Sequence, residues 1–402
     1  MKTLYLLLGL MPLLAPADTI SLPTFLKRVE ADNPELRAAA AGVDAAAAGR
    51  PLARALPDPE VSAMFENMGG ETDLRRIGVS QTLPAWGMRD AGEGMSRAET
   101  DAAKARHDQL LARLRGESIR RWADLAAMDA EIALQAERIG LWKNLVDTAE
   151  IRVRAGAPAR DLWRAQDRLA MAGDMFATLK SRRQGMAAAL TRLARTDPGA
   201  PLTLPDPSDP TDPTDQTDPT PTLRLATAME AMAESEARMA RSERRPMVML
   251  MLEQEFAPSG GMGMGEDATM ASVGLSIPLW PGKNRARIDQ AKARQAAAAA
   301  EALSMEDMQD ADVQMRRADL ADARRRLNFV REDLLPRAEN TLAVTRDAYR
   351  AGNAPFTDLL EAEDRLLQLR LSEIFARRDA LRAAAGLETL GFPFNWENSD
   401  DN

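Results

Sequence analysis

The chain contains the same unit twice, and this duplication restricts the possible folds more than any other feature. Landmark residues recur at offsets of 189, 196, 196 and 197 positions. The four pairs are Pro57 and Pro246, Gly78 and Gly274, Gly156 and Gly352, and Asp161 and Asp358. A fold for this chain must therefore repeat one order of elements, with small insertions in the second copy.

The duplication also predicts the segments of the chain. We expect a first structural repeat in residues 18–196, a second in residues 223–392 and a C-terminal tail in residues 393–402. Residues 197–222, between the repeats, are rich in Pro and Asp. Because such a composition supports neither helix nor sheet, we predict a solvated linker there.

Residues 1–17 have the pattern of a signal peptide. Lys2 precedes an apolar run, Leu4–Leu14, that is too short to span a bilayer, and Ala15-Pro16-Ala17 supplies the small residues of a cleavage site. The alternative is a buried N-terminal helix, but two polar residues follow the run directly and argue against it. We therefore expect an exported protein.

Each repeat is predicted to run in the order helix, two strands, long helix, tight turn, helix. Strands are expected at residues 59–66, 75–83, 247–256 and 269–279, as two hairpins with Gly-rich turns. The run MVMLML in the third strand also fits a buried helix by periodicity alone. The Pro before it and the glycines after it favour a strand.

The stretches that follow the strands predict very long helices. No Pro occurs from Met88 to Arg154, a span of 67 residues that would be about 100 Å long as a helix. Its counterpart, Arg285 to Arg350, contains a single Pro, Pro336. Helices of this length must pack against others in a coiled coil or tube. The last helix is expected to carry a hydrophobic seam, with charged interruptions at Asp364 and Arg378 that water on the other side would tolerate. The seam comprises Leu360, Leu367, Leu371, Ile374, Leu381 and Ala385.

The composition argues against several classes of protein. With no Cys and a single His, His107, the chain is not expected to hold disulfides, Cys-ligated zinc, iron–sulfur clusters or a Ser-His-Asp triad. The net charge of −9 argues against nucleic acid as a partner. Carboxylates are plentiful, but no nucleophile–base pair or phosphate-binding loop organises them. We predict neither an enzyme nor a cofactor, and no defined metal site.

Four strands of roughly ten residues match the length of a tilted strand that spans a membrane. Open sheet edges are not stable in lipid, and the smallest bacterial barrels have about eight strands, so several copies of the chain would have to close one barrel. Trp86 and Trp280 follow the second strand of each hairpin and are expected at the membrane–water interface. The alternative is that both Trp side chains pack a strand–helix corner in a soluble protein.

Three motifs together resemble the TolC family of outer-membrane efflux proteins. They are LPDP before the first hairpin, GVSQTLPAWG after it and YRAGNAPFTDLLEAEDRLLQLRL near the C-terminus, and the resemblance covers roughly residues 24–392. It implies a mainly α fold, in which a long antiparallel coiled-coil tunnel is joined to four transmembrane strands per protomer. It also implies a homotrimer with a twelve-stranded barrel, embedded in the outer-membrane lipid of a Gram-negative bacterium and extending into the periplasm.

The resemblance further implies an exit duct for a tripartite efflux or type I secretion system. The duct would dock onto a periplasmic adaptor, or membrane fusion protein, and an inner-membrane transporter of the RND type. The adaptor would bind the tips of the helical hairpins, at Arg154, Ala155, Gly156, Ala351 and Gly352. The alternative is a periplasmic coiled-coil adaptor or structural protein without a pore, for which the paired hairpins between Pro and Trp would have no use.

The resemblance also assigns a gate. Asp358 and Glu361 match acidic positions that ring the closed entrance, where three copies would focus negative potential and favour cations. Asp161 and Tyr349 match positions that link the outer hairpin to a neighbouring inner one, and Arg350 could assist. The alternative is that Asp161 and Asp358 only stabilise helix N-termini through the helix dipole.

The cargo stays open at this stage. Met262 and Met264 lie in the predicted loop GGMGMGED of the second hairpin, and Met64 and Met68 lie in the first hairpin. Thioether sulfur suits Cu(I) or Ag(I), and LPDP with these Met residues resembles the heavy-metal branch of the family. The alternative is that Met serves as a flexible apolar filler, with an organic toxin or a protein as the cargo.

Overall fold

A computed structural model describes residues 20–68, 71–156, 158–195, 201–205, 219–256, 267–394 and 396. The predicted signal peptide, both Gly-rich hairpin turns, Met262, Met264 and most of the predicted linker lie outside the described residues.

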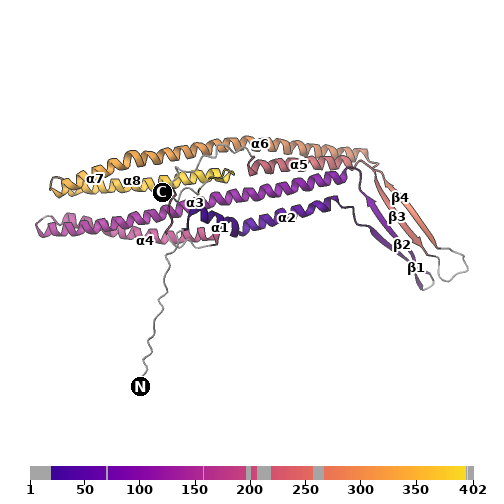
Figure 1. Cartoon of the computed structure of the whole chain (residues 1–402), viewed down its shortest axis with the longest axis horizontal. Coiled ribbons are helices and arrows are strands. Elements are labelled where there is room, and N and C mark those ends of the chain that lie inside the picture. The colour runs from indigo at the N-terminus through magenta and orange to yellow at the C-terminus, as the bar shows by residue number, and fades with distance from the viewer. Residues whose placement is uncertain are drawn as a thin grey trace, which may run out of the picture. The chain divides into compact units, whose positions relative to one another are not determined.

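Both repeats contain the predicted order of elements, and the first begins with one helix more than predicted (Figure 1). Those of the first are α1 (Leu22–Asp32), α2 (Pro34–Arg54), β1 (Glu60–Met68), β2 (Glu71–Leu83), α3 (Met88–Arg154) and α4 (Arg160–Ala194). Those of the second are α5 (Pro221–Ser242), β3 (Met247–Glu255), β4 (Ala268–Ser276), α6 (Pro281–Asn328), the π-helical segment η1 (Phe329–Leu334), α7 (Leu335–Arg350) and α8 (Phe356–Thr389). The mainly helical fold and the four strands are therefore as predicted, and α3 has both predicted ends and 67 residues.

The counterpart of α3 is interrupted by η1, directly before Pro336. Proline has no backbone N–H to donate and its ring clashes with the preceding turn, so the helix widens there, and Leu335 N donates to Val330 O five residues back. The buried side chains Val313, Leu320 and Leu327 follow a seven-residue spacing, and so do Leu335, Leu342 and Tyr349. Eight residues separate Leu327 from Leu335, so one extra residue lies between the two sets.

The described chain divides into two compact units, each built from both repeats. Unit 1 comprises Met1–Pro34, Leu111–Gln216 and Asp312–Asn402, and unit 2 comprises Glu35–Leu110 and Thr217–Ala311. The repeats describe the duplication in the sequence, whereas the units describe where segments pack, so the two divisions cut the chain at different places.

Unit 1 has a core of large apolar side chains. Phe25 of α1 packs on Trp122 of α3, with ring centroids 5.4 Å apart. Asn33 Nδ2, at the end of α1, donates to Leu193 O of α4 at 3.3 Å. Other fully buried members are Leu114, Ile119, Leu125, Leu179, Leu190, Leu381 and Leu387. This core ties the first helix of the chain to the long helical hairpin.

A buried carboxyl lies beside this core. Glu388 of α8 is 1% exposed, pairs with Arg115 of α3 and accepts a hydrogen bond from Phe394 N at 2.8 Å. Burial raises the pKa of Glu388 above its ordinary value. Burial also opposes the charge of Arg115, but Glu388 and Glu30 outweigh it and raise the pKa of that guanidinium. The tail predicted to begin at residue 393 is thus anchored at its start, where Phe394 and Trp396 are buried.

The described start of the predicted linker is also anchored instead of solvated. Leu202 is buried and its N–H donates to Asp129 Oδ2 at 2.8 Å. Trp122 Nε1 donates to Thr203 O at 3.2 Å, and Arg377 Nη2 donates to Leu204 O at 2.8 Å. Apolar residues and free carbonyls among the prolines explain why this part packs against helices. The end of the predicted linker differs too, because α5 begins at Pro221.

The helices of unit 2 pack through small side chains. Ala237, Ala240 and Ala291 form a buried cluster between α5 and α6. A Cβ placed on Gly94 of α3 would lie 3.0 Å from Ser235 Oγ of α5, so these two helices approach closely. Glu93 binds three arginines, with Arg50, Arg54 and Arg97 at 3.3, 3.2 and 2.5 Å. Hydrogen bonding from Arg97, with help from the other two, lowers the pKa of Glu93.

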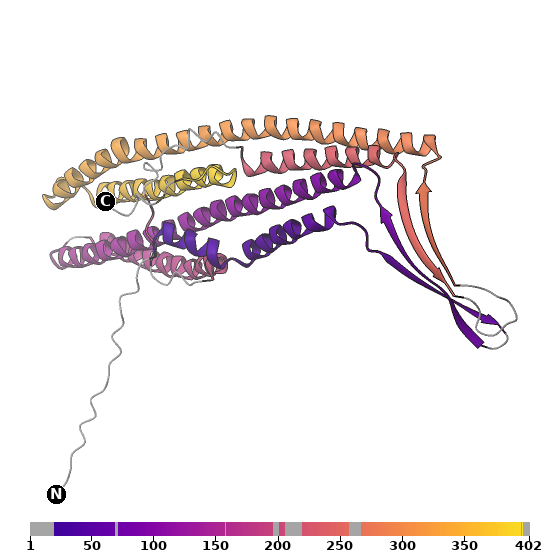
Figure 2. The same ribbon diagram turned by 45° about the vertical axis from the view of Figure 1, so that its right-hand side comes forward.

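The four strands of unit 2 form one antiparallel sheet in the order β1-β2-β3-β4 (Figure 2). The pairing of β2 with β3 joins the two repeats, for example through Val79 and Leu252. A register shift between Met64 and Phe65 marks a bulge in the first hairpin. Strands β1 and β4 are the outer members of the described sheet, so the sheet is open within one chain.

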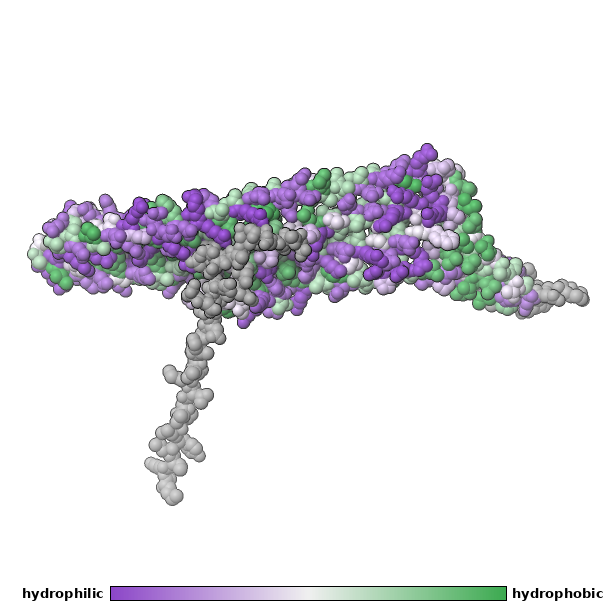
Figure 3. All heavy atoms as spheres, turned by 45° about the horizontal axis from the view of Figure 1, so that its top comes forward, coloured by the Kyte–Doolittle hydropathy of each residue, from purple (hydrophilic) through white to green (hydrophobic). Residues whose placement is uncertain are grey.

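The two faces of the sheet differ in chemistry. Alternation along the strands places one set of aliphatic side chains on a single face, and most of them are exposed, which Figure 3 shows as hydrophobic surface over the strands. We call this the aliphatic face, with members Val61, Val79, Leu250, Leu252, Val273 and Leu275. The other face carries Ser, Thr, Gly, Glu and Met, and we call it the polar face. Among the described residues, no helix has an apolar stretch long enough to cross a membrane.

Candidate functional site

The predicted gate residues lie at one end of unit 1, where two helical hairpins turn. The α7–α8 turn is closed by hydrogen bonds from Gly352 N to Tyr349 O at 3.1 Å and from Asn353 N to Ala348 O at 2.8 Å. Gly352 has a φ of +77° and Gly156, in the α3–α4 turn, has a φ of +99°. These values favour glycine, which explains the repeated Arg-Ala-Gly motif. The predicted tip residues Arg154, Ala155, Gly156, Ala351 and Gly352 are exposed at these turns.

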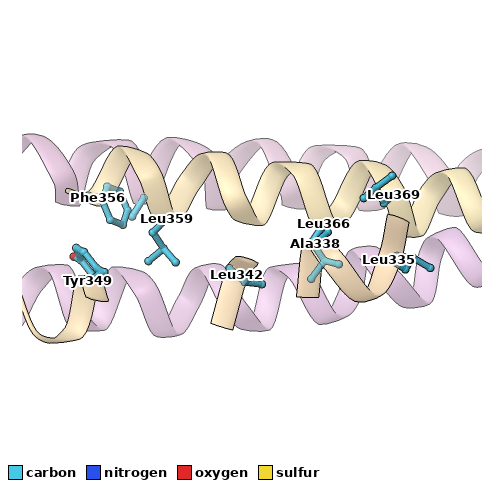
Figure 4. Close-up of a cluster of buried hydrophobic side chains, with 9 residues drawn as sticks. Leu335, Ala338, Leu342, Tyr349, Phe356, Leu359, Leu366 and Leu369 are labelled. Atoms are coloured by element: carbon cyan, nitrogen blue, oxygen red, sulfur yellow. The ribbon is translucent and has the colours of Figure 1, made fainter. Parts of the chain in front are cut away.

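The last turns of α3 and α7 are joined through one aromatic side chain. Arg152 Nη2 of α3 donates to Tyr349 O at 3.1 Å, and the guanidinium lies 4.1 Å from the centroid of the Tyr349 ring. The same ring also packs on Phe356 of α8, with centroids 5.7 Å apart (Figure 4). Tyr349 is only 6% exposed. Within one chain it therefore fastens three helix ends, and its partner on the outer hairpin is Arg152.

A second link lies farther along the hairpins. Asp364 of α8 pairs with Arg138 of α3 at 3.1 Å and with Arg168 of α4 at 2.9 Å. Burial lowers the pKa of Arg138, and Asp364 opposes that shift. Within the α7–α8 hairpin, Arg346 pairs with Glu363 at 2.8 Å. Asp364, the charge that interrupts the predicted seam, thus binds the two hairpins to each other instead of facing water.

The seam itself is displaced by one residue at the start of α8. Leu359 and Leu366 are buried, while Leu360 and Leu367 are half-buried. Leu381 and Ala385 are buried as predicted, but Arg378 lies over the Phe375 ring at 4.9 Å instead of standing free in water. Helix α8 faces α3 and α4 as well as α7, so its buried stripe is wider than a two-helix heptad pattern assumes.

The predicted gate carboxylates are accessible. Asp358 and Glu361 are exposed in the first two turns of α8, and Asp161 lies half-buried in the first turn of α4, 3.8 Å from Arg160. Glu361 lines a cavity of about 390 Å³ between α4 and α8, which also contains Arg164 and Arg168. Arg350 is exposed and pairs with Asp347 at 3.6 Å. The first-turn positions of Asp161 and Asp358 also suit the helix-dipole alternative.

In unit 2, the two tryptophans predicted at the membrane interface are exposed. Trp86 is 87% exposed and follows β2, and Trp280 is exposed directly before α6. Trp86 O accepts a hydrogen bond from Arg245 at 2.7 Å, which fixes the backbone of the strand–helix corner while the ring stands free. Neither ring packs into the corner, contrary to the soluble-protein alternative.

Part of the chain matches a known protein family. Residues 218–391 match the family described as outer membrane efflux protein. The match covers most of the second half of the chain. Proteins of the family are efflux ducts of the outer membrane, not a family of enzymes, and the resemblance to TolC channels is thereby confirmed. No curated protein matches the sequence.

Solved structures share the fold of this chain over most of its length. The outer membrane protein VceC from Vibrio cholerae is 17% identical, with a TM-score of 0.74 over 92% of this chain and 96% of that one. CusC is also 17% identical, with a TM-score of 0.77 over 92% and 91% of the two chains. The MtrE outer membrane channel of Neisseria gonorrhoeae, in its open state, is 18% identical, with a TM-score of 0.71 over 92% and 88%.

Sequence reasoning missed Arg152, Arg138 and Arg168 as residues of the candidate site. A signal for the last two was present, because a charge such as Asp364 inside a hydrophobic seam indicates a buried partner of opposite sign. For Arg152 no comparable signal exists, since it is one of many arginines on a helix whose neighbours cannot be read from spacing. Among the described residues, no group of three or more His, Asp or Glu side chains is arranged to hold a metal ion.

Proposed function

We propose that three copies of this chain form the outer-membrane exit duct of a tripartite efflux or type I secretion system. The observation that supports this function best is the open sheet of unit 2. Its aliphatic face exposes a continuous apolar surface, which is unfavourable in water, and its polar face is also uncovered. Lipid against one face and an aqueous lumen against the other would satisfy both.

The edges of the sheet support the number of copies. An unpaired edge in hydrocarbon leaves backbone groups without partners, so β1 of one copy must pair with β4 of the next. Three four-stranded sheets give twelve strands, an even number above the smallest bacterial barrels of about eight. Trp86 and Trp280, at the strand–helix corners, would then lie where aromatic side chains anchor a barrel in the outer membrane.

The hairpin turns of unit 1 are proposed as the periplasmic end of the duct. The exposed Arg-Ala-Gly turns would receive the adaptor, and an RND-type transporter would lie beneath it. Asp358 and Glu361 are exposed, and they would ring the entrance. Asp161, Tyr349 and Arg350 would hold neighbouring hairpins together, with Arg152 keeping Tyr349 in place inside each protomer.

Reconstitution tests the duct and its main alternative together. The protein purified from outer-membrane detergent extracts should insert into planar bilayers and produce single-channel conductance, and chemical cross-linking should yield trimers. Cell fractionation gives an independent readout. Recovery in the soluble periplasm without conductance would support the coiled-coil adaptor and refute the duct.

The gate has its own test. Replacing Asp358 and Glu361 by Ala in each protomer should lower the cation selectivity of the channel, because the ring of negative charge is removed. A matched control is Asp147→Ala, which removes an exposed carboxylate of α3 outside the proposed ring. Equal selectivity in the double variant and the control would remove Asp358 and Glu361 from the gate.

Two classes of cargo are proposed: metal cations such as copper or silver, which would suit the methionines, and organic toxins as the competing class. A deletion strain grown on copper, silver and a panel of dyes and antibiotics separates the two. Sensitivity to the organic compounds alone would refute metal cargo and leave the duct intact.

A further inference from the structure

The methionines of the sheet are not distributed evenly between its faces. The register places every strand methionine whose side chain is described on the polar face. These are Met64, Met247, Met249, Met251 and Met270. The aliphatic face, where an apolar side chain would gain most from lipid, carries Val, Leu, Ile and Phe instead. The segregation indicates that these thioethers serve a purpose other than contact with lipid.

Strand β3 carries three of these methionines in alternate positions, followed by two carboxylates, and its neighbours leave them room. Opposite Met249 stand Thr82 of β2 and Gly274 of β4. A Cβ on Gly274 would lie 3.6 Å from the Cβ of Met249, so the glycine opens space beside that thioether. Opposite Met251 stand two serines, Ser80 and Ser272. Long side chains on β3 thus lie between short ones on both sides.

Below Met251 the same pattern brings in a negative charge. Glu253 is paired across the sheet with Gly78 of β2 and with Met270 of β4. A Cβ on Gly78 would lie 3.1 Å from Glu253 Cγ, which places the carboxylate stem over the glycine. Met270 is therefore a direct neighbour of Glu253 and a diagonal neighbour of Met251. Side chains in such positions are within reach of one another, because diagonal neighbours are about 7–8 Å apart at Cα.

The methionine side chain has three rotatable bonds, so thioethers from neighbouring positions can converge on one ion. Thioether sulfur is a soft ligand that favours Cu(I), and Ag(I) is of the same soft class. Met249, Met251 and Met270 are accessible or half-buried, not locked in a core. The carboxylate of Glu253 supplies a negative charge beside them. Competing soft ligands are scarce, since the chain has no Cys and only one His.

We propose that Met251 and Met270, with Glu253 beside them, form a binding site for a soft monovalent cation on the polar face of the sheet. Met249 and Met247 extend the site as further thioethers along β3. The proposal rests on the duct function for its position, because closure of the sheet would make this face the wall of the lumen. Binding of the ion itself requires only the folded sheet.

Silver binding to the full-length protein tests the site. The protein in detergent is dialysed against Ag(I) in a chloride-free nitrate buffer, and bound metal is measured by mass spectrometry of the element. Leu keeps nearly the volume of Met but cannot ligate a metal, so the variant Met249→Leu/Met251→Leu/Met270→Leu should fold normally. Its apparent silver affinity should be at least tenfold weaker than that of the wild type.

A control variant removes the same number of thioethers elsewhere. Met305, Met308 and Met315 are exposed on α6, and their replacement by Leu should leave the affinity unchanged. Equal losses in the two variants would mean that silver binds any accessible thioether, and no loss in either would mean that these methionines do not bind it. Both results would overturn the proposal. As a second readout, the methyl resonances of Met249, Met251 and Met270 should shift on addition of Ag(I).

Bilayer conductance separates failure of the site from failure of the duct. Wild-type channels that conduct but bind no silver would refute the site alone. Silver binding that depends on the three methionines, in a protein that forms no pore, would refute the duct and retain the site. The Leu variant should still form conducting channels, which shows that its barrel has assembled.

Discussion

The two units of the chain are stabilised in different ways. Unit 1 buries Trp122, Phe25 and many leucines, and it encloses a paired carboxyl, Glu388. Unit 2 packs its helices through Ala and Ser and leaves both faces of its sheet exposed. Hydrophobic stabilisation is roughly proportional to the apolar area removed from water, so unit 1 gains it within one chain. Under the proposed function, unit 2 would gain this stabilisation from lipid and from further copies of the chain.

The contrast suits the proposed function. A duct needs one part whose shape is set before assembly and another part whose stability comes from assembly itself. Predictions that compare equivalent changes in the two units therefore test the interpretation directly.

The largest difference is expected between two tryptophans. Trp122→Ala removes a buried ring of unit 1 together with its hydrogen bond to Thr203 O, and should lower the free energy of unfolding by about 3–5 kcal/mol. Trp86→Ala removes an exposed ring of unit 2 and should leave unfolding in detergent unchanged while weakening insertion into lipid vesicles. Circular dichroism and a flotation assay measure the two effects. Similar losses of stability in both variants would contradict the comparison.

A somewhat smaller difference is expected between two ion pairs. Arg115→Met leaves Glu388 buried without its partner and should cost about 3 kcal/mol, of which the added change Glu388→Gln should recover part. In unit 2, Arg287→Met breaks the exposed pair with Glu243 and should cost less than about 1 kcal/mol. Denaturation of the three variants in the same detergent provides the measurement. Equal costs for Arg115→Met and Arg287→Met would show that Glu388 is not enclosed as described.

The pH dependence should have opposite signs in the two units. The pKa of Glu93 is lowered by its arginines, so its contribution is present above the ordinary Glu pKa and is lost as the pH falls through the lowered value. The pKa of Glu388 is raised by burial, so its contribution is largest below the ordinary Glu pKa and declines as the pH rises toward the raised value. Melting temperatures of Glu93→Gln and Glu388→Gln are measured from about pH 3 to about pH 8. The two variants should differ from the wild type at opposite ends of this pH range. Parallel curves would refute the assigned directions.

The smallest effect concerns two glycines of unit 1. Gly352→Ala places a Cβ at a φ of +77° and should cost about 1 kcal/mol, although the site is sterically open. Gly140→Ala, inside α3 and also in open space, should instead stabilise by about 0.5–1 kcal/mol. Melting temperatures should shift in opposite directions. A stabilised Gly352→Ala variant would show that the turn does not need a left-handed residue.

Much of the fold follows from local signals in the sequence. Absence of Pro and the Arg-Ala-Gly turn determine both ends of α3, and Pro and Gly clusters bracket all four strands. What the sequence leaves undetermined is relative position. The seam of α8 begins at Leu359 instead of Leu360 because three other helices face it, and spacing on one helix contains no information about the number of its neighbours.

The candidate site shows the same limit. The turns and their carboxylates were placed by motif, but Arg152 became a partner of Tyr349 only through the packing of two hairpins. The polar face of the sheet was equally inaccessible, because a shift of one residue in strand register exchanges the faces. Methionines scattered through the sequence therefore became neighbours only when β3 and β4 were paired.

The π-helical segment before Pro336 has a consequence for how such a hairpin can change in length. One residue added to a regular helix turns everything beyond it by about 100°, which would carry Leu335, Leu342 and Tyr349 off the buried side. The wide turn absorbs that residue, and the side chains before and after it stay on one line. Length and rotational phase are thus uncoupled at this point. The residue that the wide turn accommodates therefore causes no change at the hairpin turn, where Tyr349 lies.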